Sequence, residues 1–262
     1  AVVRLWRAHH VRLAEATAAD EPLLARITAH LAGRGISAEA GIVAAIGPVV
    51  SGALTSAGHV RDRFSADGWL ALDELDQTLA EIAANAQPGD ETVHAMGELL
   101  RKINGFSGLV HENMYRFTGW RFLSIGRALE RAGILIETLS DFADPAAPDG
   151  SLDLATETAD STITHRRRYA SAPSRASVVD LLALDPLNPR ALLYQLNEIT
   201  THLSFLPGGE RHRQLPPLQR ALLHLQSSVA TSTPEALDTQ ALQHLLPKIT
   251  GLSELIGEAY FV

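Results

Sequence analysis

The sequence predicts an all-α protein, a single bundle-like domain of about ten helices without a sheet, spanning residues 1–262. Alanine and leucine dominate the composition, and only 5% of the residues are aromatic. Such a composition favours helix, whereas runs rich in valine, isoleucine, threonine and aromatic residues, which favour strands, are nearly absent. Apolar residues also recur three and four positions apart, as in Trp69, Leu72, Leu75, Leu79 and Ile82. With 46% hydrophobic residues, the chain can bury a sizeable core.

The helices are placed by this periodicity and by the residues that start and stop helices. Candidate N-caps are Asp20, Ser65 or Asp67, Ser151, Asn188 and Thr233. Gly47-Pro48 is expected to end a helix, and Pro247 marks a candidate kink. The proline-rich loop 144–150 is the best candidate for a mid-chain boundary, although the helices on both sides can share one core. The expected helices span 1–17, 20–31, 36–46, 49–63, 68–85, 91–115, 118–143, 151–169, a short segment around 178–182, 189–205, 215–230 and 233–261.

Charge and composition exclude several classes of function. The formal net charge is −8, and the chain has no basic tract, so we do not expect a nucleic-acid partner. The absence of cysteine excludes disulfides and thiol chemistry. No apolar run approaches the roughly 20 residues that span a bilayer, and no signal peptide opens the sequence. We therefore expect a soluble, cytoplasmic bacterial protein that does not contact a membrane.

The first residues suggest that the sequence is part of a longer polypeptide. The segment 1–16 has no initiator methionine and is already amphipathic at Val2, Leu5, Trp6 and Leu13. We expect the chain to begin inside a helix.

Standard catalytic and cofactor motifs are missing. The glycines between Gly47 and Gly58 are not followed by a Walker ending, and there is no G-x-S-x-G segment. A dinuclear metal site in a helical bundle needs two Glu-x-x-His motifs, and only Glu91-x-x-His94 has that spacing. We expect neither a metal nor a cofactor.

Two charged residues lie on the apolar stripe of the predicted helix 118–143. Arg127 and Glu130 lie three residues apart between Leu123 and Ile134, and residues at this spacing can touch. Charges are rarely buried unless they are paired or hydrogen-bonded. The pattern therefore predicts either a structural ion pair or a functional site.

Further polar residues could join this pair. His111 and Glu112 precede the helix. Arg166 continues the apolar line Leu152, Ala155, Ala159, Ile163, which predicts that at least one of three consecutive arginines points inward towards a carboxylate. The candidate catalytic residues are Glu112 and Glu130. The candidate anion-binding residues are Arg127, Arg131, Arg166, Arg167, Arg168, Tyr169, Asn188 and Arg190.

Three interpretations of these residues stay open. They could form an internal salt-bridge network that fixes helix register, or lie at solvated helix ends. They could also line a polar cavity whose arginines bind an anion, with Glu112 or Glu130 as the acid or base.

Several segments resemble the bacterial alpha-E family, an all-helical domain named for a glutamate-arginine motif. The segments are HENMYRFTGWRFLSIGRALERA, ITHRRRY, LDPLNPRALLYQL, RDRFSADGW and the closing AYF. In this resemblance Glu130-Arg131 is the motif. Family members usually carry an additional N-terminal helix start with another glutamate-arginine pair, which this sequence lacks.

The resemblance implies association, fused or separate, with circularly permuted ATP-grasp proteins, and with transglutaminase-like and proteasome-like hydrolase proteins as further company. The leading hypothesis is a helical partner of an ATP-grasp-type peptide or amide ligase that binds an anionic peptide, amino acid or acyl-phosphate. One alternative is an enzyme acting on peptide or amide bonds. Neighbouring arginines would lower the pKa of Glu130, which leaves Glu112 as the better base. The other alternative is a structural interaction module.

Overall fold

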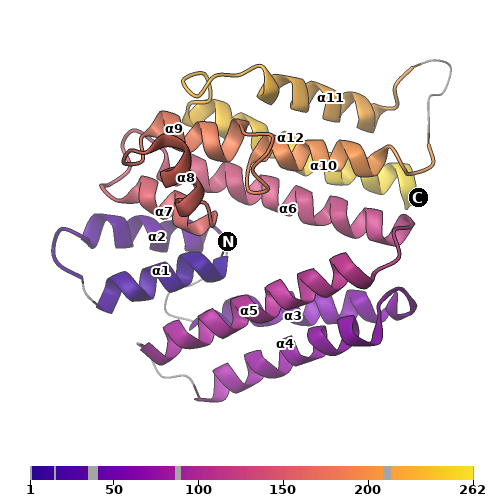
Figure 1. Ribbon diagram of the computed structural model, residues 1–262, viewed down its shortest axis with the longest axis horizontal. Coiled ribbons are helices and arrows are strands. Elements are labelled where there is room, and N and C mark those ends of the chain that lie inside the picture. Colours follow the sequence, from indigo (N-terminus) through magenta and orange to yellow (C-terminus); the bar gives the residue numbers. More distant parts are fainter. Residues whose placement is uncertain (1, 15, 35–40, 86–89, 209–213, 262) are drawn as a thin grey trace. The chain divides into compact units, whose positions relative to one another are not determined.

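The computed structural model describes residues 2–14, 16–34, 41–85, 90–208 and 214–261 (Figure 1). These residues form twelve α-helices, one short 3-10 turn and one π-helical turn, with no β-strand among them. The predicted all-α class is confirmed. None of the described helices is long and apolar enough to cross a membrane.

The chain divides into two compact units between Tyr115 and Arg116. The candidate boundary at 144–150 lies inside the second unit. The first unit contains α1 (Val2–Ala14), α2 (Glu21–Gly33), α3 (Gly41–Gly58), η1 (Arg61–Arg63), α4 (Ala66–Asn85) and α5 (Asp90–Asn113). The second contains α6 (Thr118–Phe142), α7 (Ser151–Thr158), α8 (Thr162–Tyr169), α9 (Arg175–Val179), the π-helical turn η2 (Asp180–Leu184), α10 (Leu192–Leu203), α11 (Pro217–Ala230) and α12 (Thr239–Tyr260).

In the first unit, α5 packs against α1 and α4, and α4 also packs against α3. The core includes Trp6, Ile27 and Leu99, each at most 1% exposed. The predicted apolar line of α4 is buried at Leu72, Leu75 and Leu79, with Ile82 at its end. Ser65 starts α4, because its hydroxyl accepts the backbone N–H of Gly68 at 3.0 Å. This predicted cap is confirmed.

In the second unit, α6 packs along α10 and α12, and α11 packs on both of those helices (Figure 1). The shared core contains Leu139, Phe142, Leu196, Ile199 and Leu242, all fully buried. Because α6 is the central helix of this unit, polar residues along its edge have their positions fixed by its packing.

The predicted helix 151–169 is two helices, and this difference changes which residues point inward. α7 ends at Thr158 and α8 begins at Thr162, with Asp160 in the left-handed region at φ 56°. The backbone N–H of Ser161 turns back to the carbonyl of Thr156 at 2.8 Å. Aspartate tolerates this conformation better than most residues, so a break forms without glycine.

Other predicted helix starts are displaced. Ser151 does not cap α7, whose N-cap is Gly150, and α10 begins only after Ala191. The last helix begins after Asp238, whose carboxylate accepts the N–H of Ala241 at 2.7 Å, rather than after Thr233. The side chains of Asn188 and Thr233 accept backbone N–H groups within their own turns instead, and the buried Ser151 hydroxyl makes no hydrogen bond with a described residue.

Two further predictions concern the first unit. Asp20 accepts bonds from the backbone and hydroxyl of Thr17 and does not cap α2. The stop predicted at Gly47-Pro48 is wrong, because α3 continues through Pro48 to Gly58. A proline removes one ladder hydrogen bond, and here the helix tolerates that loss. Residues 36–40 of the predicted helix 36–46 lie outside the described part of the chain, as do the predicted turn residues Gln87 to Gly89.

A core truncation on α10 tests the packing of the second unit. We expect Leu196→Ala to lower the free energy of unfolding by about 2–5 kcal/mol, because it removes buried methyl groups and leaves a cavity. The matched control is Leu223→Ala on α11, where the side chain is 48% exposed and the expected change is within about 0.5 kcal/mol. Urea denaturation of the whole chain measures both. Equal stabilities of the two variants would contradict this packing.

Candidate functional site

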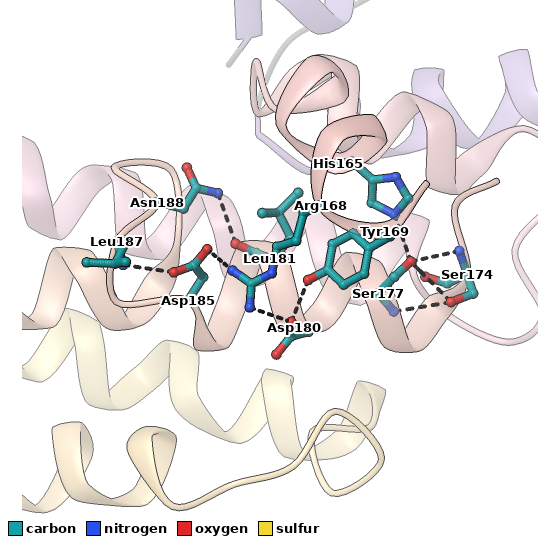
Figure 2. Close-up of polar contacts among 10 residues, drawn as sticks. All are labelled: His165, Arg168, Tyr169, Ser174, Ser177, Asp180, Leu181, Asp185, Leu187 and Asn188. Atoms are coloured by element: carbon teal, nitrogen blue, oxygen red, sulfur yellow. Dashed lines mark hydrogen bonds and ion pairs between the residues drawn. The ribbon is translucent and has the colours of Figure 1, made fainter. Parts of the chain in front are cut away.

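Arg168, near the end of α8, belongs to a network of polar contacts (Figure 2). Arg168 forms a hydrogen-bonded ion pair with Asp185 and contacts Asp180 at 3.1 Å. The hydroxyl of Tyr169 donates to the same Asp180 carboxylate. Burial, and then this hydrogen bond, raise the pKa of Tyr169 well above its usual range, so the phenol stays protonated. Arg168 and Tyr169, both predicted to bind an anion, here fasten α8 to the two ends of η2.

Asn188 is part of the same internal framework. It is buried, and its amide donates to the carbonyl of Leu181 at 2.9 Å. Its side-chain oxygen accepts the backbone N–H of Arg190 at 3.0 Å. Asn188 therefore shapes the turn before α10 and holds the backbone from which Arg190 projects.

The prediction that Arg166 points inward is wrong. Arg166 and Arg167 are exposed, and so is Ile163, at 71%. The predicted apolar line assumed one continuous helix from Ser151, but the break at Asp160 changes the rotational phase of α8. Arg168 is also exposed, at 43%, but it is the arginine of the three that contacts carboxylates, those of Asp180 and Asp185.

The predicted pairing of Arg127 with Glu130 is also wrong. Glu130 is exposed, and among the described residues no ion pair joins it to Arg127. Three helical positions correspond to a rotation of about 300°, so Glu130 lies about 60° away from Arg127 around α6. That offset is sufficient to turn the carboxylate to solvent while the arginine stays half-buried.

The half-buried Arg127 has a second arginine near it. Burial, and then the positive charge of Arg190, lower the pKa of the Arg127 guanidinium. Arg190 contacts the carboxylate of Asp160 at 3.5 Å, with 32% of its own side chain exposed. Thus the left-handed Asp160 and the buried Asn188 together orient Arg190, and two like charges approach each other beside α6.

Arg131 lies one turn after Arg127 on the same side of α6. Its charge acts on Tyr194 of α10, whose pKa is raised mainly by burial, then by Glu198, with Arg131 opposing. Adjacent helical residues point about 100° apart, so Arg131 faces α10 while its neighbour Glu130 faces solvent. Arg127, Arg131 and Arg190 are called the arginine cluster below.

A second group, which the sequence analysis did not identify, joins the other end of α10 to α6. The Arg121 guanidinium contacts the imidazole Nδ1 of His202 at 3.1 Å. It lies 3.9 Å from the ring centroid of Phe205 and 4.9 Å from that of Trp120, and Arg116 lies 4.1 Å from the Trp120 ring. The alternation of arginine and aromatic residues in segment 116–122 is the only sequence signal for this group.

His202 is held neutral inside this group. Burial, and then the charges of Arg121 and Arg116, lower its pKa to about 4. Arg121 can only donate, so Nδ1 of His202 accepts and its proton resides on Nε2. That nitrogen lies 3.8 Å from the carboxylate of Glu198.

The two candidate catalytic carboxylates belong to different units of the chain. Glu112 is exposed near the end of α5 in the first unit, and Glu130 is exposed on α6 in the second. Neither has the apolar surroundings that adapt a carboxyl group for proton transfer. Their catalytic role stays a prediction. No group of residues suited to hold a metal is present in the described parts of the chain.

Comparison with known proteins now adds to this geometry. Residues 2–261 match the family described as a predicted alpha-helical domain with a conserved ER motif. The chain belongs to the Alpha-E family. It contains two Glu-Arg dipeptides, Glu130-Arg131 on α6 and Glu210-Arg211, the second of which lies outside the described residues.

Curated relatives are uncharacterized proteins, one of Mycobacterium bovis and two of Mycobacterium tuberculosis. Each is 28% identical to this chain over 211 residues, which cover 78% of the chain. The match covers only 24% of each relative, so this Alpha-E chain corresponds to about a quarter of their length. No solved structure matches it.

A pair of arginine substitutions tests the framework in Figure 2. We expect Arg168→Ala to lower the free energy of unfolding by about 2–3 kcal/mol, because Asp185, only 7% exposed, loses its charged partner. The control Arg167→Ala removes the adjacent, exposed arginine and should change stability by less than about 0.5 kcal/mol. Denaturant unfolding compares them, and an equal effect of the two changes would refute the structural role of Arg168.

The burial of His202 predicts a specific pH dependence. Between pH 6.5 and about 4 the unfolded chain binds a proton at this residue and the folded chain does not, so stability falls as the pH decreases through that range. The loss amounts to roughly 3 kcal/mol. His202→Gln keeps an acceptor for Arg121 but does not titrate, so its stability should fall less than that of the wild type. Parallel pH profiles of the two proteins would contradict this assignment.

Proposed function

We propose that this Alpha-E domain is the helical partner of an ATP-grasp-type peptide or amide ligase. Its arginine cluster binds an anionic group of the ligase's substrate, which is a peptide, an amino acid or an acyl-phosphate. The observation that carries the proposal is the environment of Arg127, a half-buried cation placed beside another cation.

The electrostatics of Arg127 favour a bound anion. A half-buried guanidinium is normally matched by a carboxylate, since an uncompensated buried charge is costly. Arg127 instead has Arg190 as its charged neighbour, and in the described residues no carboxylate is bonded to it. An anion between Arg127 and Arg190 would offset both the burial and the repulsion. Guanidinium groups bind carboxylates and phosphates through paired hydrogen bonds, so both chemistries fit.

The position of the arginine cluster supports a role in binding an anion rather than in proton transfer. Arg127 and Arg131 come from α6, and Arg190 from a turn that Asn188 and Asp160 hold. Rigid elements of this kind position a ligand well. Arginine does not exchange protons near neutral pH, and His202, which lies in the separate Arg121 group, is kept neutral.

Support for the ligase partner comes from the family resemblance and from the relatives' length. The carboxylate or acyl-phosphate on which an ATP-dependent amide ligase acts is an anion of the class that the cluster fits. In the mycobacterial relatives the matched segment is 24% of a longer protein, an arrangement in which this domain works beside others.

Stability in the presence and absence of an anion tests the binding site. Without ligand, we expect Arg127→Met to unfold at the same temperature as the wild type or higher, because the change relieves burial of charge and repulsion. With N-acetylglutamate or inorganic phosphate, the wild type should be stabilised and the variant should not. The control Arg166→Met, at an exposed site, should respond like the wild type. A variant that is destabilised without ligand would mark Arg127 as a packing residue instead.

The partnership is tested by co-purifying the full Alpha-E polypeptide with its ATP-grasp protein and measuring ATP-dependent ligation. Losing one charge-assisted contact should reduce kcat/KM about 10–100-fold in Arg127→Met. Arg166→Met should ligate at the wild-type rate. Full activity of an intact complex carrying Arg127→Met would refute the proposed role of the cluster.

A further inference from the structure

We infer that the arginine cluster is one end of a longer strip along the contact between α6 and α10, and that this strip binds an extended acidic peptide. The inference rests on the proposed function and specifies its ligand. The strip consists of Arg116, Trp120, Arg121, Arg127, Arg131, Arg190, Tyr194, Glu198, His202 and Phe205, and we call it the α6–α10 strip.

The two helices run in opposite directions along this strip. Trp120, near the start of α6, has its ring 4.8 Å from that of His202, near the end of α10. Arg131, a further eleven residues along α6, acts on Tyr194 near the start of α10. Figure 1 shows α6 and α10 side by side over this length.

Arg127 and Arg131 share one side of α6 with Trp120, whereas Arg121 lies about 100° from Trp120 around the helix. At about 100° per residue, Trp120, Arg127 and Arg131 fall within about 40° of one another. This side lies at the edge of the α10 contact, since all three are half-buried while Ile125 and Ala128 are fully or almost fully buried. Arg127, Arg131 and Trp120 therefore lie along one edge, and Arg121 joins this edge through the contact of its guanidinium with the Trp120 ring.

Arg121 provides a second uncompensated cation on the strip. Its guanidinium contacts the neutral His202 and the faces of Trp120 and Phe205, with no carboxylate bonded to it in the described chain. Its Nε is buried and makes no hydrogen bond with any described residue. A guanidinium placed on aromatic rings keeps its positive charge for an incoming anion, and Phe205, 65% exposed, offers apolar contact beside it.

The charge along the strip is opposite to that of the whole chain. The strip carries five arginines, while Glu198 is its one carboxylate and Asp160 lies at its end. The protein as a whole has a formal charge of −8. Positive charges gathered along one edge of a net-negative protein attract a small anionic ligand to that edge.

The length of the strip selects a chain-like ligand. From the start of α6 at Thr118 to Arg131 the helix rises by about 20 Å at about 1.5 Å per residue, and Arg116 lies in the turn before it. An extended peptide of about six or seven residues covers that distance at about 3.3 Å per residue. A single carboxylate or phosphate occupies only one end of it.

The overall charge favours an acidic peptide over a nucleic acid. Binding of nucleic acids depends on neutralising many phosphates, and a chain with a net charge of −8 and no basic tract does not favour it. A peptide with a few acidic side chains matches the arginines and places its remaining residues on the aromatic groups.

Fluorescence anisotropy with the full chain tests the inference. The probes are labelled hexaglutamate, N-acetylglutamate as an unlabelled competitor, and labelled hexathymidylate. We expect hexaglutamate to bind at least about tenfold more tightly than N-acetylglutamate, because several contacts act together. Arg121→Met should weaken hexaglutamate binding about tenfold and leave N-acetylglutamate binding unchanged. Arg127→Met should weaken both, and the exposed control Arg166→Met should weaken neither.

A second variant guards against loss of folding. Arg116→Met alters an exposed residue at the same end and should reduce hexaglutamate binding in the same selective way. If Arg121→Met does not fold, Arg116→Met decides the question.

The outcomes separate this inference from the proposed function. Equal affinities for hexaglutamate and N-acetylglutamate, or unchanged hexaglutamate binding in both variants at the Arg121 end, overturn the strip and leave the arginine cluster intact. Tighter binding of hexathymidylate than of hexaglutamate also overturns it. N-acetylglutamate binding that survives Arg127→Met overturns the proposed function itself.

Discussion

The packing of α6 against α10 and α12 is the constraint on which the second unit depends. These helices bury Leu139, Phe142 and Leu196 completely, so α6 cannot rotate without exposing its core face. The same packing fixes the edge of α6 that carries Arg127 and Arg131. The arginines are therefore half-buried because the core forms. The burial of apolar side chains elsewhere in the unit offsets the unfavourable free energy of partly burying these charges.

A second framework supports the loop that faces this edge. Arg168 and Tyr169 hold the ends of η2, and Asn188 continues the connection to Arg190 (Figure 2). π-helical turns are uncommon and are frequent near functional sites. Here the turn lies between the anchored end of α8 and the segment that presents Arg190. Arg168, Tyr169 and Asn188, which the sequence predicts to bind an anion, thus act indirectly. They position Arg190, which remains partly exposed.

Most of the fold follows from local patterns, whereas the site does not. Helical periodicity predicts α4 and α6 well, and Ser65 is recognisable as a cap. The break at Asp160 depends on a left-handed residue that is not glycine, and this break decides which of the arginines 166–168 reaches the carboxylates of Asp180 and Asp185. The contact of Arg121 with His202 joins residues 81 positions apart. Local spacing carries no information about such a pair, so neither the neutral histidine nor the second uncompensated arginine was predictable.

The two residues of the Glu-Arg dipeptide of α6 are adjacent in sequence but have different surroundings in the structure. Adjacent residues of a helix point about 100° apart, and Glu130 is exposed while Arg131 faces Tyr194 of α10. The two members of the dipeptide therefore have different surroundings. The arginine belongs with Arg127 and Arg190, where an anion improves the local electrostatics. The glutamate lies outside that cluster, which explains why the cluster retains a positive charge that Glu130 would otherwise cancel.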